Sequence, residues 1–464
     1  HRKKGNRISR MNLTQLHSIY FLGIGGIGMS ALAKWFKHRG LSVGGYDRLS
    51  TPLTRSLEAL DIEVHYEDQI SQLSEKYRED PQTLVVYTPA MSASSQLLKF
   101  FKVGGFQIKK RSEVLGMITR DHFSIAIAGT HGKTTTSSMV AHVMQSSTKD
   151  CSAFVGGIMT NYDSNLLIGA EEGVVVVEAD EFDRSFLQLS PDFSVVTSLD
   201  PDHLDIYGDA DEMTKSYLAF IHKTHLEGEI LLHKDVSSKL GANLLRKHRT
   251  YGLEGAEITA KNIRVEASKF VFDYAGAVEI KNLHLALPGF HNVENALAAI
   301  TAALDRGVEP DFIKEAIESY RGVKRRFEFI LDRPNLVYID DYAHHPNEID
   351  ALLKSAKKLY PEKKITVVFQ PHLFTRTRDF HQEFAEKLSL ADEIIMLDIY
   401  PAREQPIPGV DAHLILDRIT QVNKKIISLD DFPMILEGLQ VEVLLTVGAG
   451  SIDTLVPIIK SFYT

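Results

Sequence analysis

The stretch FLGIGGIGMSALAKWF, Phe21 to Phe36, carries glycines in G-x-G-x-x-G register at Gly23, Gly25 and Gly28. An apolar strand pattern precedes these glycines, and an apolar pattern of helical period follows them. In α/β proteins such a strand-loop-helix unit holds a pyrophosphate on backbone N–H groups at the start of the helix. The motif does not distinguish a dinucleotide from another diphosphate, so on its own it leaves a dehydrogenase possible.

A second strand-loop-helix pattern follows at SIAIAGTHGKTTTSSMVAHVM, residues 124–144. Gly129 and Gly132 allow backbone N–H groups to turn inward, Lys133 adds a positive charge, and the Thr134 hydroxyl can ligate Mg²⁺. Ile127 stands where the full G-x-x-x-x-G-K-[ST] motif has its first glycine. The pattern nevertheless favours binding of a nucleoside triphosphate over a structural turn.

Length and composition narrow the class of protein. A chain of 464 residues favours two or three domains. Its 52 basic residues are outnumbered by 61 acidic ones, and there is no basic run beyond the first ten residues, which argues against a nucleic-acid or membrane-surface partner. A single cysteine, Cys151, excludes a disulfide framework and suits a reducing cytosol, so we expect a cytoplasmic protein.

The sequence shows neither a membrane span nor a clear secretory signal. No run of about 18 apolar residues indicates a membrane span. The basic N-terminus followed by an apolar stretch imitates a secretory signal, but the glycines and the absence of a clear cleavage site favour a strand-turn-helix. We leave residues 1–10, before Met11, out of the fold argument as an upstream or added tail.

Alternating strand and helix patterns predict three α/β units, which we place at 11–119, 120–322 and 323–464. In the first, a helix is expected over 27–39. In the second, period-two alternation over 257–289 predicts a β-meander, and a helix follows over 292–304 with Asn292 as its N-cap. In the third, each apolar strand pattern ends in polar or glycine residues.

Carboxylates gather just after two strand patterns of the second unit. GVVVVEAD and the residues after it contain Glu178, Asp180, Glu181 and Asp183. Because Glu178 is closest to its strand, we predict that it ligates an Mg²⁺ ion that bridges phosphates. His203, in SLDPDHLDIYG, is a candidate for a second metal ligand or a proton-transfer group.

Charged and imidazole side chains also follow the strand patterns of the third unit, where ligands bind in open α/β sheets. They are Asp340, His344, His345, His372, Arg376, Arg378 and Arg403. QPHLFTRTR could hold a substrate carboxylate between arginines, although ordinary surface arginines explain it equally well. Arg325 and Arg326, at the junction of the second and third units, could reach a γ-phosphate or form an interdomain salt bridge.

Eight stretches taken together resemble the Mur ligases, and within them the branch that adds L-alanine. They are GIGGIGMSALA, AGTHGKTTT, EADEFDRSFLQL, DPDHLDIYG, GFHNVENALAA, RRFE, DYAHHPNE and QPHLFTRTR. The resemblance spans about residues 20 to 450. It implies a Rossmann-like N-terminal domain that binds a UDP-sugar, a central P-loop ATPase-type α/β domain, and a Rossmann-like C-terminal domain.

The resemblance also implies an activity. This activity is ATP-dependent amide formation between the lactyl carboxylate of UDP-N-acetylmuramate and L-alanine, through an acyl phosphate, in peptidoglycan precursor synthesis. ATP and Mg²⁺ are the implied cofactors, and the expected state is a monomer or a homodimer. Lys133, Mg²⁺ and Arg326 would stabilise charge on the transferred phosphoryl group.

The implied site residues fall into four groups, with Lys133, His203 and Arg326 as the catalytic ones. The UDP-sugar residues are Gly23, Gly25, Gly26, Gly28, Asp47, Thr88, Asn161, Arg184 and Ser185. The ATP residues are Gly129, Thr130, His131, Gly132, Lys133, Thr134, Thr135, His291, Asn292, Asn295, Arg326 and Asp340. The metal ligands are Thr134, Glu178 and His203, and the L-alanine residues are His344, His372, Arg376 and Arg378.

Three alternatives stay open at this point. A related Mur ligase could add another amino acid or a recycled peptide. An NAD-dependent oxidoreductase would use Asp47 for a ribose, but it leaves the second phosphate loop without a role. A non-catalytic regulator with degenerate nucleotide sites is the third, and the presence of Lys133, Thr134, Glu178 and His203 counts against it.

Overall fold

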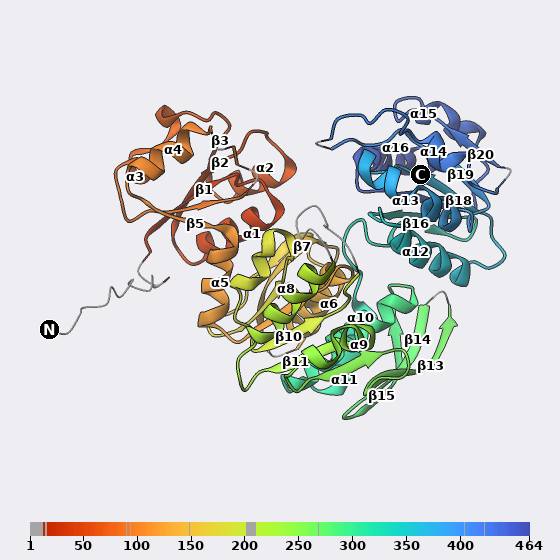
Figure 1. Cartoon of the computed structure of the whole chain (residues 1–464), viewed down its shortest axis with the longest axis horizontal. Coiled ribbons are helices and arrows are strands. Elements are labelled where there is room, and N and C mark those ends of the chain that lie inside the picture. Colours follow the sequence, from red (N-terminus) through yellow and green to blue (C-terminus); the bar gives the residue numbers. More distant parts are fainter. Residues whose placement is uncertain are drawn as a thin grey trace. The chain divides into compact units, whose positions relative to one another are not determined.

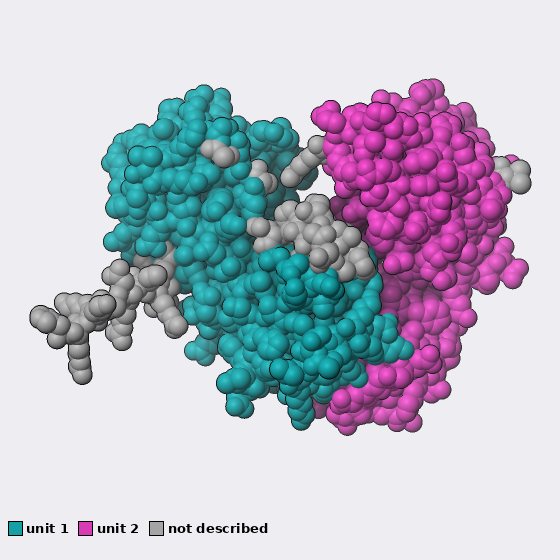
Figure 2. Space-filling model, viewed as in Figure 1, with its two compact units in different colours: residues 1–158, 163–250, 298–308 teal, residues 159–162, 251–297, 309–464 magenta. Residues whose placement is uncertain are grey.

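The computed structural model describes residues 13, 16–89, 91–92, 94–147, 149–200, 210–267, 269–402, 404–421 and 423–464. Internal contacts divide the chain into two compact units (Figure 2). One comprises 1–158, 163–250 and 298–308, and the other comprises 159–162, 251–297 and 309–464. The boundaries at 119/120 and 322/323 therefore stay predictions.

The N-terminal segment forms a five-stranded parallel sheet in the order β3-β2-β1-β4-β5 (Figure 1). Its strands are β1 (Ser18–Leu22), β2 (Ser42–Tyr46), β3 (Glu63–His65), β4 (Leu84–Tyr87) and β5 (Gln107–Lys110). Its helices are α1 (Ile27–His38), α2 (Pro52–Glu58), α3 (Glu75–Arg78), α4 (Gln96–Val103) and α5 (Arg111–Asp121). The strand order reverses at β1, so the loops after β1 and β4 meet where parallel sheets bind ligands.

A ten-stranded sheet follows, in the order β15-β14-β13-β12-β11-β10-β6-β9-β7-β8. Its first strands along the chain are β6 (Ser124–Ala128), β7 (Cys151–Met159), β8 (Ser164–Leu167), β9 (Val174–Glu178), β10 (Phe193–Val196), β11 (Glu229–His233) and β12 (Arg249–Gly252). The helices here are α6 (Lys133–Gln145), α8 (Ala210–His222) and α9 (Lys234–Leu240). The central strands β6 and β10 are wholly buried, as their continuous apolar sequences require.

The β-meander expected over 257–289 is confirmed. Strands β13 (Ile258–Glu266), β14 (Lys269–Ala275) and β15 (Glu279–Leu285) pair antiparallel. Helix α10 (Phe290–Asp305) begins two residues earlier than expected, so the prediction of Asn292 as its N-cap is wrong. The Asn292 side chain lies inside the first turn instead, and its Nδ2 donates to the Pro288 carbonyl at 2.7 Å. Helix α11 (Pro310–Ser319) follows.

The C-terminal segment forms a six-stranded sheet in the order β16-β17-β21-β18-β19-β20. The strands are β16 (Glu328–Arg333), β17 (Leu336–Asp341), β18 (Ile365–Phe369), β19 (Glu393–Met396), β20 (Lys424–Ile426) and β21 (Val443–Val447). All pairs are parallel except β16 with β17. The helices are α12 (Pro346–Leu359), α13 (Phe374–Leu388), α14 (His413–Leu416), α15 (Phe432–Ile435) and α16 (Leu455–Tyr463). Across the part of the chain that the structure describes, no helix is both long and apolar enough to cross a bilayer.

Candidate active site

The glycine loop after β1 closes against residues that follow two neighbouring strands. Gly23 has φ +88, and a Cβ there would lie 2.8 Å from Cγ2 of Thr88, which follows β4. The backbone N–H of Gly25 donates to Oδ2 of Asp47, which follows β2, at 2.7 Å. Any side chain at Gly23 or Gly25 would therefore push these loops apart. Three of the predicted UDP-sugar loops, after β1, β2 and β4, do meet in the structure.

This loop opens onto a pocket of about 240 Å³. The lining includes Gly26, Gly28 and Thr88 from the N-terminal sheet, and Gly156, Glu178 and Asp180 from the next one. Arg111, the first residue of α5, also lines it and was missed by the sequence reasoning. Its Nη1 would stand 2.7 Å from a Cβ at Gly28, and its Nη2 lies 3.4 Å from Oδ2 of Asp180. A guanidinium thus lies beside the start of α1, where an anion is expected.

The second glycine loop places a hydroxyl and a carboxylate together. Gly132 has φ +79 and caps α6, a conformation that favours glycine. The Thr134 hydroxyl donates to Oε1 of Glu178 at 2.9 Å, and the Gly156 N–H donates to Oε2 of the same carboxylate at 2.7 Å. These hard oxygen donors at a helix N-terminus fit an Mg²⁺ ion beside phosphates.

The proposed third metal ligand, His203, lies outside the described residues. Among the residues that are described, no group of three His, Cys, Asp or Glu side chains is placed to hold a metal. The metal set therefore stays a prediction, supported by the Thr134–Glu178 contact.

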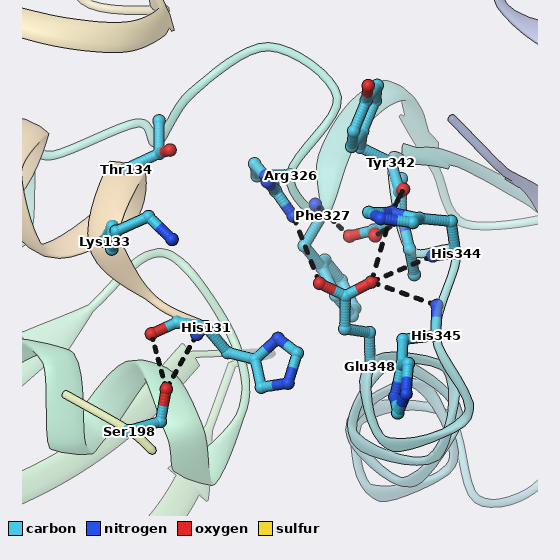
Figure 3. A network of polar contacts seen from close by, with 12 residues as sticks. His131, Lys133, Thr134, Ser198, Arg326, Phe327, Tyr342, His344, His345 and Glu348 are labelled. Atoms are coloured by element: carbon cyan, nitrogen blue, oxygen red, sulfur yellow. Dashed lines mark hydrogen bonds and ion pairs between the residues drawn. The ribbon is translucent and has the colours of Figure 1, made fainter. Parts of the chain in front are cut away.

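Lys133 lies in a mostly buried position at the start of α6 (Figure 3). Its Nζ donates to the Gly129 carbonyl at 2.5 Å and to Oε1 of Glu181 at 2.8 Å. Burial alone would lower the pKa of Lys133, but the carboxylates of Glu181 and Glu178 outweigh it and raise that pKa. The lysine is held charged at the mouth of the phosphate loop.

The second glycine loop forms hydrogen bonds with Ser198, which follows the end of β10. Thr130 Oγ1 lies 2.9 Å from the Ser198 hydroxyl, which also accepts the His131 N–H at 2.7 Å (Figure 3). His131 Nε2 lies 3.7 Å from Oδ2 of Asp200. Thr135 is buried within α6. These contacts fix the backbone of the loop, and Ser198, the first residue of SLDPDHLDIYG, is a supporting residue that the sequence reasoning did not single out.

The three residues predicted near adenine lie together at the start of α10. Asn292 and Asn295 are buried, and Asn295 Nδ2 donates to Asn292 Oδ1 at 3.1 Å. His291 is exposed beside them. The pair of amides is braced from within the helix, so its orientation is fixed before any ligand arrives.

Arg326 sits in a strained turn just before β16. Its neighbours Arg325 and Phe327 have φ +63 and +46, unusual values for residues with side chains. Two consecutive aspartates hold this turn: Asp340 Oδ2 accepts from Arg325 Nε at 3.0 Å, and Asp341 Oδ2 accepts from the Phe327 N–H at 2.7 Å. A Tyr342 N–H bond to the Arg325 carbonyl at 2.6 Å completes the support.

The position of Asp340 bears on its predicted contact with the ATP ribose. Its side chain is only 1% exposed, and Oδ1 accepts from Thr446 Oγ1 at 2.6 Å. Both carboxylate oxygens are thus used inside the protein, which favours a structural role. The ribose contact stays a prediction.

Three of the four residues predicted for L-alanine lie together. The rings of His344 and His372 are 5.9 Å apart, and Arg376 Nη1 lies 3.4 Å from Nδ1 of His372. Tyr400, missed from the sequence, stacks on His372 at 5.7 Å. Arg378 is different: its side chain is 52% exposed and its Nε donates to Asp379 at 2.7 Å.

Three further UDP-sugar predictions receive less support from the geometry. Asn161 uses its amide on the backbone at the end of α11, accepting from the Arg321 N–H at 2.7 Å and donating to the Ser319 carbonyl at 2.9 Å. Arg184 is exposed with φ +54, and its Nη2 lies 3.7 Å from Glu212 Oε2. Ser185 is partly exposed next to it. Their contacts with a muramoyl group stay predictions.

Comparisons with known proteins show which family this chain resembles. Three family models match: the Mur ligase family catalytic domain at 18–123, the Mur ligase middle domain at 127–303, and the Mur ligase glutamate ligase domain at 325–450. The UDP-N-acetylmuramate–L-alanine ligase of Cytophaga hutchinsonii is 47% identical, over 97% of both chains. That of Flavobacterium johnsoniae is also 47% identical, over 97% of this chain and 98% of its own.

Among solved structures, the UDP-N-acetylmuramate-alanine ligase of Thermotoga maritima superposes with a TM-score of 0.79 at 29% identity, covering 96% of this chain and 99% of that one. It shares the three-domain α/β architecture expected from the sequence. With family models along most of its length and close relatives over nearly all of it, the chain belongs to the Mur ligase family.

Proposed function

We propose that the chain is an ATP-dependent ligase that joins L-alanine to the lactyl carboxylate of UDP-N-acetylmuramate, releasing ADP and phosphate. The observation that carries this proposal is the placement of two glycine loops in one compact unit. One loop faces a pocket lined by Arg111, and the other presents Lys133 and the Thr134–Glu178 pair. Eight relatives at 43–47% identity all carry the name of this activity.

The two loops suit two different phosphorylated substrates. A free carboxylate is a poor electrophile, so amide formation needs its conversion to an acyl phosphate. Lys133 would place its charge on the phosphoryl group in transfer, and Arg326 would add a second cation. A dehydrogenase would have no use for the second loop, and this sets the oxidoreductase alternative aside.

Thr134 and Glu178 would hold an Mg²⁺ ion, which when bound neutralises charge on the phosphates of ATP. The glycine loop after β1 would hold the diphosphate of the UDP-sugar on backbone N–H groups at the start of α1. Arg111 is the guanidinium best placed to assist it, because it reaches Gly28. His344, His372 and Arg376 would receive L-alanine, with the arginine on its carboxylate.

Release of phosphate from ATP tests the proposal. Release should require both UDP-N-acetylmuramate and L-alanine, and mass spectrometry should show the amide product. Release that ignores the sugar, or oxidation of NADH, would refute it. Replacing L-alanine by other amino acids or by a tripeptide in the same assay separates the related ligases: a preferred tripeptide would assign the chain to peptide recycling.

A further inference from the structure

One histidine of the C-terminal segment is fixed in a single tautomer. Nδ1 of His344 lies 3.0 Å from the Tyr342 carbonyl oxygen and 3.3 Å from Oε2 of Glu348 (Figure 3). A carbonyl oxygen can only accept, so Nδ1 carries the proton and donates it. The lone pair of the imidazole is then on Nε2. The His344 side chain is 20% exposed, so a small molecule can reach the ring.

Glu348 is held rigidly enough to orient this ring. Oε2 accepts the backbone N–H of His344 at 2.9 Å and that of His345 at 3.2 Å, which caps the start of α12. Oε1 lies 3.9 Å from Nη1 of Arg326. One carboxylate therefore joins the helix cap, the histidine and the arginine predicted to act on phosphate. A carboxylate 3.3 Å from Nδ1 also stabilises the imidazolium cation that forms when Nε2 accepts a proton, and such a pairing is typical of a general base.

The environment of the ring keeps it in the neutral form, with its Nε2 lone pair free of a proton. Burial lowers the pKa of His344, Glu348 opposes this, and Arg376 and Arg326 reinforce it. His372, the other imidazole facing the ring, has its pKa lowered to about 4. Both rings are consequently neutral at neutral pH. The amino group of a free amino acid is a cation under the same conditions and must lose a proton before it can attack.

We propose that His344 accepts the proton of the attacking L-alanine amine and that Glu348 positions it for this task. The inference rests on the proposed function, and it assigns the proton acceptor that the motifs leave open. In the step, an N–H bond of the ammonium breaks, its electron pair stays on nitrogen, and the proton goes to Nε2. The amine forms a C–N bond to the acyl phosphate carbonyl, and the C–O bond to phosphate breaks with its electron pair leaving on phosphate. The second proton of the attacking nitrogen goes to the departing phosphate, which leaves as hydrogen phosphate, so the amide is neutral.

Hydroxylamine gives a direct test, because it is largely unprotonated at neutral pH and needs no base to become a nucleophile. The holoenzyme with ATP, Mg²⁺ and UDP-N-acetylmuramate is given either L-alanine or hydroxylamine, and amide or hydroxamate is measured. For His344→Gln we expect kcat with L-alanine to fall about a hundredfold or more, with hydroxamate formation close to that of the wild type. Equal losses with both nucleophiles, or no loss with either, would overturn the proposal.

The same experiment separates this proposal from the proposed function. If the wild-type enzyme makes no hydroxamate, no acyl phosphate is formed and the proposed function itself fails. If it makes hydroxamate and His344→Gln loses it, only the role of His344 fails. A rise of kcat/KM for L-alanine with pH in His344→Gln, of about tenfold per unit as free amine accumulates, is the further signature of a missing base.

Two variants complete the design. Glu348→Gln keeps an accepting oxygen for the helix cap but removes the charge, so kcat with L-alanine should fall and the acidic limb of its pH profile should move to lower pH. If the acidic limb of the pH profile does not move, the positioning role of Glu348 is excluded.

His345→Asn removes the adjacent imidazole, whose ring packs on Phe380 at 5.0 Å, while leaving a good N-cap residue. It should keep both reactions; loss of the L-alanine reaction alone would move the base to His345 and overturn the assignment.

Discussion

Nζ of Lys133 lies 2.8 Å from Oε1 of Glu181, and the two side chains are only 14% and 3% exposed. The lysine comes from the start of α6, and the glutamate lies just before the 3₁₀ helix of Phe182–Gln188. Removing either partner of such a buried pair leaves the other charge without compensation. Glu181 thus holds Lys133 beside the second glycine loop, although no phosphate motif contains it.

This pairing predicts a strong coupling in stability. Glu181→Gln and Lys133→Met should each lower the free energy of unfolding by about 3 kcal/mol, because each strands a buried charge. The double variant should be more stable than the sum of the two losses predicts, since it removes both charges. Denaturant unfolding of the four proteins checks this. If the loss in the double variant equals the sum of the two single losses within about 0.5 kcal/mol, the two side chains do not stabilise one another.

A second prediction concerns Lys133→Ala. Phosphate release should fall by at least about a hundredfold, because the variant lacks the cation next to the phosphoryl group. Affinity for UDP-N-acetylmuramate, measured by calorimetric titration, should stay nearly unchanged, because the glycine loop after β1 belongs to a different sheet from Lys133. A parallel loss of sugar binding would show that the two loops are not independent.

A third prediction concerns Arg111, whose Nη1 reaches the start of α1. Arg111→Ala should weaken binding of the UDP-sugar by about tenfold to a hundredfold, as expected for loss of a charge-assisted hydrogen bond. Arg111→Lys should restore part of the affinity by charge alone. Titration of both variants with the UDP-sugar and, separately, with an ATP analogue distinguishes a ligand contact from misfolding. If nucleotide binding weakens as much as sugar binding, Arg111 acts through the Asp180 ion pair instead.

The sequence predicts the parts of this molecule that depend on local order. Gly23, Gly132 and Lys133 lie in strand-loop-helix units whose spacing alone dictates their geometry, and the structure places them as expected. Residues supplied by distant segments carry no such signal. Arg111 begins a helix that resembles many others, and it contacts Gly28 only because β5 and β1 belong to one sheet. Tyr400 is likewise brought to His372 by sheet pairing rather than by a motif.

Helix starts show the same limit. Asn292 has the residue type of an N-cap, yet α10 starts before it because its amide caps the turn from within by donating to the Pro288 carbonyl. In contrast, Glu348 lies three residues after His345 and forms a capping box with it. The sequence pattern is hard to recognise because the first residue of a capping box is usually Ser or Thr, not His. A search for acidic residues at the third helical position would have found it.

A last prediction concerns pH and His372. Burial lowers the pKa of His372 from 6.5 to about 4, with His344 and Arg376 acting in the same direction and Glu404 opposing them. Well above pH 6.5 the ring is neutral in both folded and unfolded states and contributes nothing to the pH dependence. As the pH falls from 6.5 to about 4, the unfolded chain takes up a proton that the folded one resists, so stability is lost across this window, by about 3 kcal/mol at most.

His372→Gln should therefore lose less stability than the wild type between pH 7 and pH 5, as measured by urea unfolding. His413→Gln is the matched control, because its parent side chain is 56% exposed, and it should follow the wild type. Parallel curves for His372→Gln and the wild type would mean that the folded protein accepts this proton without cost.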